Sequence, residues 1–254
     1  MSDVTVSVDE AHVALVEIHR PPANFFDAAL ICAIADAYAG LDADPACRAI
    51  VLCSEGKHFC AGANFGATAG GSVAEDPRSL YEHALRLFRS QTPIVAAVQG
   101  AAVGGGLGLA LSADFRVATR ESRFSANFSR LGFHHGFGLT VTLPALAGQQ
   151  TARDLLYTGR RVAGEEAFRL GLCDRLAAQD ELRATAHSLA NEIAASSPLA
   201  VRSIRATLLG DLADRVAAAL EHEAAEQDRL RETEDFREGV RASLERREPR
   251  FNGR

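Results

Sequence analysis

IVAAVQGAAVGGGLGLALSADFRVA, residues Ile94 to Ala118, is the stretch that decides the fold of this chain. It opens with an apolar run rich in Val and Ala, which predicts a short buried strand. Three glycines at 104–106 follow, and the next residues, 107–111, are mostly good helix formers. A second apolar run at 115–118 predicts another strand. The stretch therefore predicts strand, glycine turn, helix and strand in succession.

Three glycines at the start of a helix are costly, because glycine loses more backbone entropy on ordering than any other residue. In return, a bare backbone allows close approach and exposes N–H groups. The first N–H groups of a helix have no partner within the helix and carry partial positive charge. They can hold a carbonyl oxygen that gains negative charge during a reaction. Close helix–strand packing without any ligand is the alternative interpretation.

A second turn of small residues has the same character. The segment HFCAGANF, residues 58–65, follows the apolar run at 49–54, which predicts a buried strand. Two such turns can each direct one backbone N–H at a common oxygen atom.

Four segments together make the chain resemble the crotonase family, also called the enoyl-CoA hydratase/isomerase family. They cover nearly the whole chain: FCAGAN (59–64), PIVAAVQGAAVGGGLGLALSADFRVA (93–118), YTGRRVAGEEAFRLGLCDRL (157–176) and EGVRASLERREPRF (238–251). These segments are specific for the fold and for acyl-CoA binding, and less specific for the reaction.

The resemblance implies an α/β fold, a crotonase-like spiral of β-β-α repeats with a helical C-terminal region. The change from alternating strands and helices to helices alone near Asp174 predicts a boundary between a spiral core, residues 1–174, and a helical trimerisation region, residues 175–254. The resemblance also implies a homotrimer or a hexamer.

Other elements follow from hydrophobic periodicity. Alternating residues predict a hairpin of strands at 4–8 and 13–18, before a helix at 28–41. Further helices are predicted at 79–90, 139–146, 151–158 and 164–170, while 124–131 reads as short and irregular. From residue 180 onward the chain is almost entirely helix-forming.

Composition excludes several classes of protein. The 254 residues carry a net charge of −6 without a strongly basic patch, so a nucleic-acid partner is not expected. No apolar run approaches the ~20 residues that span a bilayer. The five cysteines lack C-x-x-C spacing, which favours reduced thiols in a cytoplasmic protein and no metal site. We expect no cofactor apart from the coenzyme A of the substrate.

The resemblance assigns the thioester-polarising N–H groups to Ala63 and Gly105, which would stabilise an enolate-like oxyanion. Two departures from the family pattern concern the reaction. Gly108 stands where the hydratases have one catalytic glutamate, and Phe128 stands where they have the second. Neither residue can transfer a proton, so hydration by two glutamates is not expected.

His134 and His135, in the loop GFHHGFG, are the candidates to replace the glutamates. Imidazole titrates near neutral pH and suits proton transfer. A loop histidine that bonds to backbone at a subunit contact is the alternative. Phe128, Phe133 and Phe137 would favour an apolar or aromatic acyl group, and packing in the core explains them equally well.

For coenzyme A, the resemblance points to Asn24 and Ala61, which would line the channel through their backbone, and to Arg246, which would contact phosphate. Arginine suits phosphate geometry. The alternative for Arg246 is an exposed helix face.

Two functions remain open. The first is an acyl-CoA-processing enzyme with a proton carrier other than glutamate. The second is a catalytically silent acyl-CoA-binding protein, which the two missing glutamates favour. A Rossmann-type dinucleotide enzyme is disfavoured, because the glycines at 104–108 lack G-x-G-x-x-G spacing.

Overall fold

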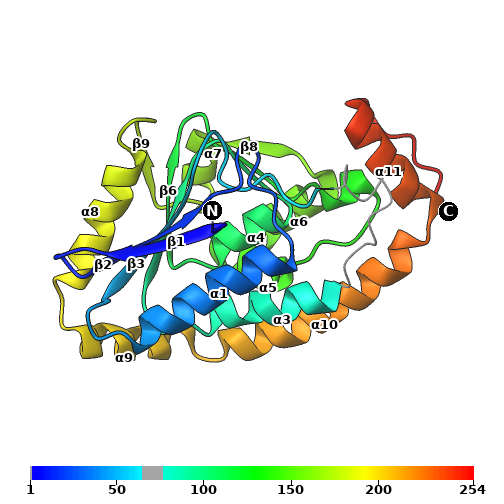
Figure 1. The fold of residues 1–254 in the computed structure, drawn as a ribbon. Helices are drawn as coiled ribbons and strands as arrows, with labels where there is room; N and C mark the ends of the chain where they lie inside the picture. Colours follow the sequence, from blue (N-terminus) through cyan, green and yellow to red (C-terminus); the bar gives the residue numbers. More distant parts are fainter. Residues whose placement is uncertain (1, 65–76) are drawn as a thin grey trace.

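The computed structural model describes residues 2–64 and 77–254 as a mixed α/β fold (Figure 1). The strands are β1 (Val4–Val8), β2 (Val13–Ile18), β3 (Ala49–Ser54), β4 (Ile94–Val98), β5 (Ala101–Val103), β6 (Phe115–Thr119), β7 (Arg123–Ser125), β8 (Arg161–Ala163) and β9 (Arg175–Ala177). The helices are α1 (Ala28–Ala43), α3 (Pro77–Phe88), α4 (Gly105–Leu111), the 3-10 helix η1 (Asn127–Leu131), α5 (Leu139–Ala147), α6 (Gln149–Thr158), α7 (Gly164–Arg169), α8 (Leu182–Ala194), α9 (Pro198–Leu209), α10 (Leu212–Arg231) and α11 (Glu234–Glu245).

The main sheet has the strand order β1-β2-β3-β4-β6-β9. The predicted hairpin is confirmed, since β1 and β2 pair antiparallel, and every later pair in this sheet is parallel. All residues of β3 and β4 are buried, as expected of parallel strands covered on both faces.

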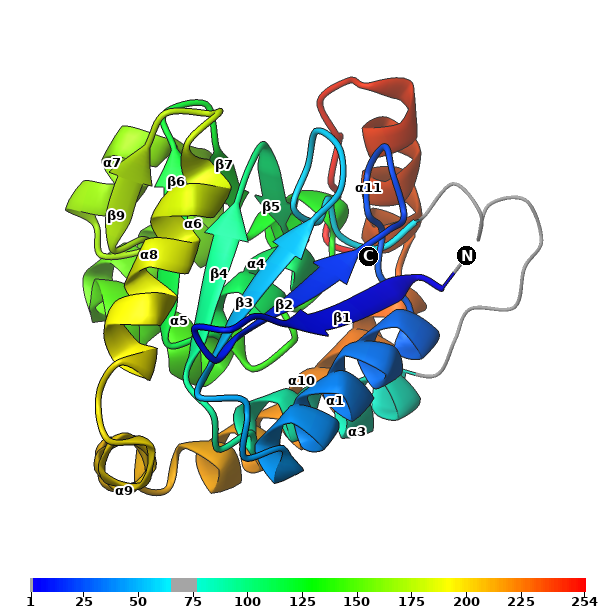
Figure 2. The same cartoon turned by 60° about the vertical axis from the view of Figure 1, so that its left-hand side comes forward.

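The alternation of side chains along β3 separates two layers of core. Ile50 and Leu52 pack with α1 and α4, whereas Val51 and Cys53 pack with the apolar face of α8. Figure 2 shows α8 on one face of the sheet and α1 on the other. A strand buried on both faces has no polar alternation, which is why its sequence is a continuous apolar run.

A second sheet, with the order β5-β7-β8, was not predicted from the sequence. Each of its strands is three residues long, and β5 pairs parallel with β7 while β7 pairs antiparallel with β8. Runs this short carry no measurable periodicity, which is why the sequence predicts only irregular structure at 124–131. The sheet matters for the site because β5 leads directly into the glycines that open α4.

The C-terminal part of the chain is helical beyond β9. The predicted boundary at residue 174 falls just before β9, which joins the main sheet beside β6. Helix α8 covers that sheet, and α10 lies along α3 and α5 (Figure 1). The division into a core and a trimerisation region stays a prediction. In the described part of the chain, no helix has the length and apolarity to cross a bilayer.

Candidate active site

The turn after β3 lies against the second sheet. Cys60 forms a parallel bridge with Ala102 of β5, and Ala63 forms one with Phe26 just before α1. The Phe26 N–H donates to the Gly62 carbonyl at 3.1 Å. The turn is thus fixed between β5 on one side and the residues that lead into α1 on the other.

The glycines of α4 are needed because this turn approaches them closely. Gly104 has φ +58°, a conformation that favours glycine. A Cβ atom at Gly105 would overlap the ring of Phe26, and one at Gly106 would overlap the carbonyl of Cys60. The backbone of one turn therefore touches the backbone of the other.

The two proposed oxyanion donors lie at equivalent points of this arrangement. Ala63 comes three residues after Cys60, and Gly105 comes three residues after its bridge partner Ala102. Within residues 2–64 and 77–254, neither the Ala63 N–H nor the Gly105 N–H has an acceptor. Gly105 is the first residue of α4, where an N–H has no partner inside the helix.

The space at Gly108, the predicted position of the first hydratase glutamate, is filled by an aromatic ring. A Cβ atom at Gly108 would lie 2.8 Å from Cδ1 of Phe137, closer than two carbon atoms can pack. The Phe137 side chain is 1% exposed and meets the ring of Phe26 edge-on at 5.8 Å. No side chain fits at residue 108 while this ring stays in place.

Phe128, at the predicted position of the second glutamate, has equally apolar surroundings. The ring of Phe128 is 7% exposed and lies 5.5 Å from that of Phe133, which meets Phe236 of α11 at 5.1 Å. Phe128, Phe133 and Phe137 all belong to the main core cluster. The core interpretation of these residues is therefore confirmed.

His134 and His135 stack on each other with ring centroids 4.1 Å apart. His134 Nδ1 lies 2.8 Å from the His135 carbonyl, so it donates to that oxygen. The His134 ring also meets His222 of α10 edge-on at 5.7 Å. Both histidines lie in the loop whose Phe137 reaches Gly108, which links this loop to the start of α4.

Sequence analysis missed Glu223, which lies beside these histidines on α10 and is fully buried. Its carboxylate accepts from the Gly138 N–H at 2.9 Å, the Thr140 N–H at 3.0 Å and the Thr140 hydroxyl at 2.6 Å. A signal was present in the sequence, because Glu223 falls on the helical stripe of Val216 and Leu220 that faces the core.

The electrostatics of this cluster follow from burial. Desolvation, together with the nearby His134 and His222, lowers the pKa of His135 to about 3. His135 is therefore neutral at pH 7, and its contact with Glu223 at 4.0 Å is not an ion pair. Desolvation also raises the pKa of Glu223, against the three hydrogen bonds that favour its charged form.

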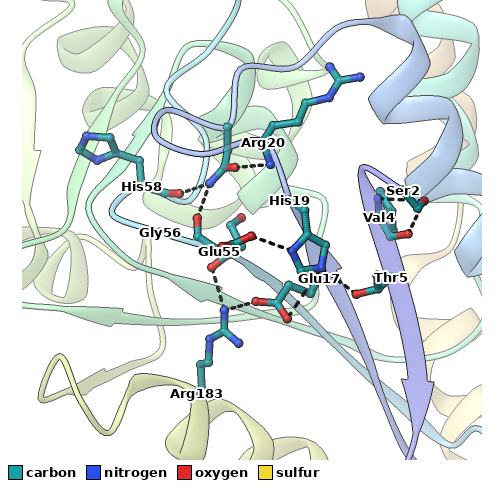
Figure 3. Close-up of polar contacts among 12 residues, drawn as sticks. Ser2, Val4, Thr5, Glu17, His19, Arg20, Glu55, Gly56, His58 and Arg183 are labelled. Atoms are coloured by element: carbon teal, nitrogen blue, oxygen red, sulfur yellow. Dashed lines mark hydrogen bonds and ion pairs between the residues drawn. The ribbon is translucent and has the colours of Figure 1, made fainter.

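Asn24 is fully buried, and its side chain holds the turn before α1. Its Oδ1 accepts from the Arg20 N–H at 2.9 Å, and its Nδ2 donates to the carbonyls of Glu55 and His58 at 2.8 and 2.6 Å. Figure 3 shows Arg20, Glu55 and His58 around this point. The side chain is fully occupied, so any contact of Asn24 with coenzyme A must come from its backbone.

Hydrogen bonds from neighbouring polar groups stabilise the backbone before α1 and after β3. His19 lies 2.9 Å from Oε2 of Glu55 and 2.8 Å from the hydroxyl of Thr5, and Arg183 of α8 donates to the Ser54 carbonyl at 2.9 Å (Figure 3). Ala61 donates its N–H to the Ala23 carbonyl at 2.9 Å. The backbone on both sides of the predicted channel is thus held in place.

Arg246 lies at the C-terminal end of α11 with φ +55°. It is exposed, and within the described residues its guanidinium makes no ion pair, whereas Arg247 pairs with Glu238 at 2.6 Å. Its assignment to coenzyme A stays a prediction. Across residues 2–64 and 77–254, no group of three His, Cys, Asp or Glu side chains could hold a metal ion.

Three kinds of comparison with known proteins match nearly the full length of this chain to the same family. Residues 9–254 match the family described as enoyl-CoA hydratase/isomerase. A putative enoyl-CoA hydratase from Thermus thermophilus is 36% identical over 255 residues, which cover 97% of this chain and 100% of the relative. Crotonyl-CoA hydratase from Syntrophomonas wolfei is 33% identical over 247 residues, 95% of each chain. The solved structure of an enoyl-CoA hydratase/isomerase from Pseudoalteromonas atlantica has a TM-score of 0.88 at 29% identity and covers 99% of this chain and 100% of that one.

Proposed function

Since the chain belongs to the enoyl-CoA hydratase/isomerase family and has its fold, we propose that it polarises an acyl-CoA thioester with the backbone N–H groups of Ala63 and Gly105. The observation that carries this proposal is that both N–H groups lack an acceptor within the described residues, at equivalent points of two touching turns. Donors held in place where charge develops lower the barrier, and loss of one typically costs about 2.7–4 kcal/mol. Coenzyme A enters as part of the substrate, and no separate cofactor is required.

The proposed proton carrier is a histidine of the 132–138 loop. Gly108 and Phe128 cannot transfer a proton, and the ring of Phe137 excludes a side chain at residue 108. Isomerisation, thioester hydrolysis and C–C cleavage need the enolate and one proton-transferring group, a role we assign to His135. Its lowered pKa, in place of the near-neutral value expected from the sequence, makes it a weak base that is neutral and able to accept a proton at pH 7. Reactions of this kind are favoured over hydration by two glutamates.

The first experiment is incubation of the protein with crotonyl-CoA and a panel of acyl-CoA esters, with products followed by mass spectrometry. We expect turnover of at least one ester. His135→Ala should abolish turnover while acyl-CoA binding, measured by calorimetry, survives, because the variant keeps the oxyanion donors. Unchanged turnover in both His134→Ala and His135→Ala would exclude a histidine as the proton carrier.

A catalytically silent acyl-CoA-binding protein is the second candidate, favoured by the aromatic rings at both glutamate positions. It predicts micromolar binding of acyl-CoA without any product from the panel. Turnover at an ordinary enzyme rate, ~1–10³ s⁻¹, excludes it.

The proposal extends to assembly and location. A homotrimer or a pair of trimers is supported by α9, on which no residue is buried. A cytoplasmic location is supported by the five cysteines, which are all free and mostly buried, the state that a reducing compartment maintains.

A further inference from the structure

Glu223 is a buried ionisable group to which the proposed function gives no role. It receives three hydrogen bonds at the start of α5, two of them from the backbone N–H groups of Gly138 and Thr140. Those two bonds explain the residue as a cap of α5, where negative charge is favourable. The third bond, from the Thr140 hydroxyl, is not needed for capping, and it leads to His135.

The proton of the Thr140 hydroxyl can be assigned from its two neighbours. Its Oγ1 lies 2.6 Å from Oε1 of Glu223 and 2.9 Å from Nε2 of His135. Both oxygens of Glu223 accept backbone N–H groups, Oε2 from Gly138 and Oε1 from Thr140, which is the pattern of a carboxylate, and the Thr140 hydroxyl then donates to Oε1. A hydroxyl has one proton, and Thr140 Oγ1 can therefore only accept from His135. The proton of neutral His135 consequently sits on Nε2.

The other nitrogen of the ring is left with its lone pair. Within residues 2–64 and 77–254, His135 Nδ1 has no hydrogen-bond partner. The buried side-chain atoms there that lack a partner do not include Nδ1, so this nitrogen is not sealed inside the protein. The ring itself is held by the stacked ring of His134, whose carbonyl accepts from Gln227 at 3.0 Å. Glu223 and Gln227 are one helical turn apart, so one face of α10 fixes both histidines.

We propose that Glu223 is a positioning residue which, through the Thr140 hydroxyl, keeps His135 in its Nε2–H tautomer and leaves Nδ1 as the proton acceptor. The inference rests on the proposed function for its chemical use. In that step a proton passes from the α-carbon of the thioester to Nδ1, and the C–H electron pair becomes the enolate. The carboxylate of Glu223, 4.0 Å from Nε2, then stabilises the imidazolium.

The charged and titratable groups that face this ring come from three elements. His134 lies in the same loop, His222 and Glu223 lie on α10, and Tyr81 lies on α3 and donates to Gln227 at 3.0 Å. Among the described residues that face the ring, Glu223 is the only carboxyl group, and burial raises its pKa and that of Tyr81.

The test is the ¹⁵N spectrum of histidine-labelled protein near pH 7.5, in which the two neutral tautomers have distinct shifts. His135→Gln assigns the signals of residue 135 by their loss. We expect the Nε2–H tautomer in the unmodified protein and in Thr140→Ser, which keeps the hydroxyl. Thr140→Val, which keeps the shape and the backbone bond to Glu223, should lose this preference. Thr142→Val, on the same helix, is the matched control and should retain it.

Two outcomes overturn the inference: a wild-type His135 in the Nδ1–H tautomer, or a Thr140→Val spectrum identical to that of the wild type. Neither outcome depends on turnover, so the proposed function can fail while the tautomer assignment stands. Where a substrate is turned over, Thr140→Val should lower kcat about tenfold or more with KM unchanged, and Thr140→Ser should restore it. A fall in both parameters that Thr140→Ser does not restore would show a structural role alone.

Discussion

Gly108 and Phe137 form a matched pair of residues. The Phe137 ring occupies the volume that a side chain at residue 108 would need, and Phe137 itself has φ +63°, which is unusual for a residue other than glycine. A glutamate introduced at residue 108 alone therefore has no room while Phe137 stays in place. The two positions must change together, because overpacking a filled core is destabilising.

A double-mutant cycle measures this coupling. Gly108→Glu should lower the free energy of unfolding by about 1–3 kcal/mol through overpacking, and more through the buried charge. Combining it with Phe137→Gly, which suits a positive φ, should recover at least about 1 kcal/mol of that loss. Gly40→Glu on α1 is the control, since a Cβ there meets nothing within 4 Å. Additive effects in urea unfolding would show that the ring does not restrict residue 108.

At the scale of elements, the junction of the 132–138 loop with α10 makes stability depend on pH. The pKa of His135 is lowered to about 3, so the folded state releases a proton that the unfolded chain binds below about pH 6.5. The contribution of neutral His135 to the free energy of unfolding is fully present above pH 6.5 and is lost as the pH falls toward 3. Glu223 has the opposite effect on stability because its pKa is raised. Its contribution to the free energy of unfolding is present at low pH and is lost as the pH rises.

The expected size follows from linkage. Between pH 7.5 and pH 5, the wild type should lose about 2 kcal/mol more of its unfolding free energy than His135→Gln, which has no imidazole to protonate. Glu223 is present in both proteins, so comparing them isolates the histidine. Urea unfolding at the two pH values measures the difference, and equal losses in both proteins would mean that His135 is not desolvated.

At the scale of the whole molecule, α9 stands out because none of its residues is buried within the described part of the chain. Leu199 and Leu208 are each 80% exposed and Ile204 is 58% exposed. Exposed apolar side chains grouped on one element are typical of contacts between proteins. They support the proposed self-association through the C-terminal region.

The double variant Leu199→Glu/Leu208→Glu should shift the protein toward monomer in sedimentation velocity experiments. Each leucine buried at an interface stabilises it by about 1.5–3 kcal/mol, and a glutamate there is left without a partner. Tyr157→Glu on α6 is the matched control, since Tyr157 is 75% exposed and lies outside α9. Dissociation by the control but not by the double variant would place the interface elsewhere.

The sequence by itself determined the elements whose residues signal their own structure. The hairpin of β1 and β2, the buried strands β3, β4 and β6, and the helix after the glycines were all predicted, because hydrophobic periodicity and glycine act locally. The family was also readable, since it is a statement about residue types at fixed spacing, whereas the assignment of Gly108 and Phe128 to the hydratase glutamate positions stays a prediction.

Only the tertiary structure decided what depends on contacts between distant segments. The second sheet was missed because its three-residue strands are stabilised by pairing partners 22 to 40 residues away, from Ala101 with Arg123 to Arg123 with Ala163, rather than by their own pattern. The same reason applies to Phe137 at Gly108 and to Glu223 beside His135, whose positions follow from the packing of α10 and of one loop against α4. A buried side chain takes its chemistry from its neighbours, and the sequence does not state which neighbours these are.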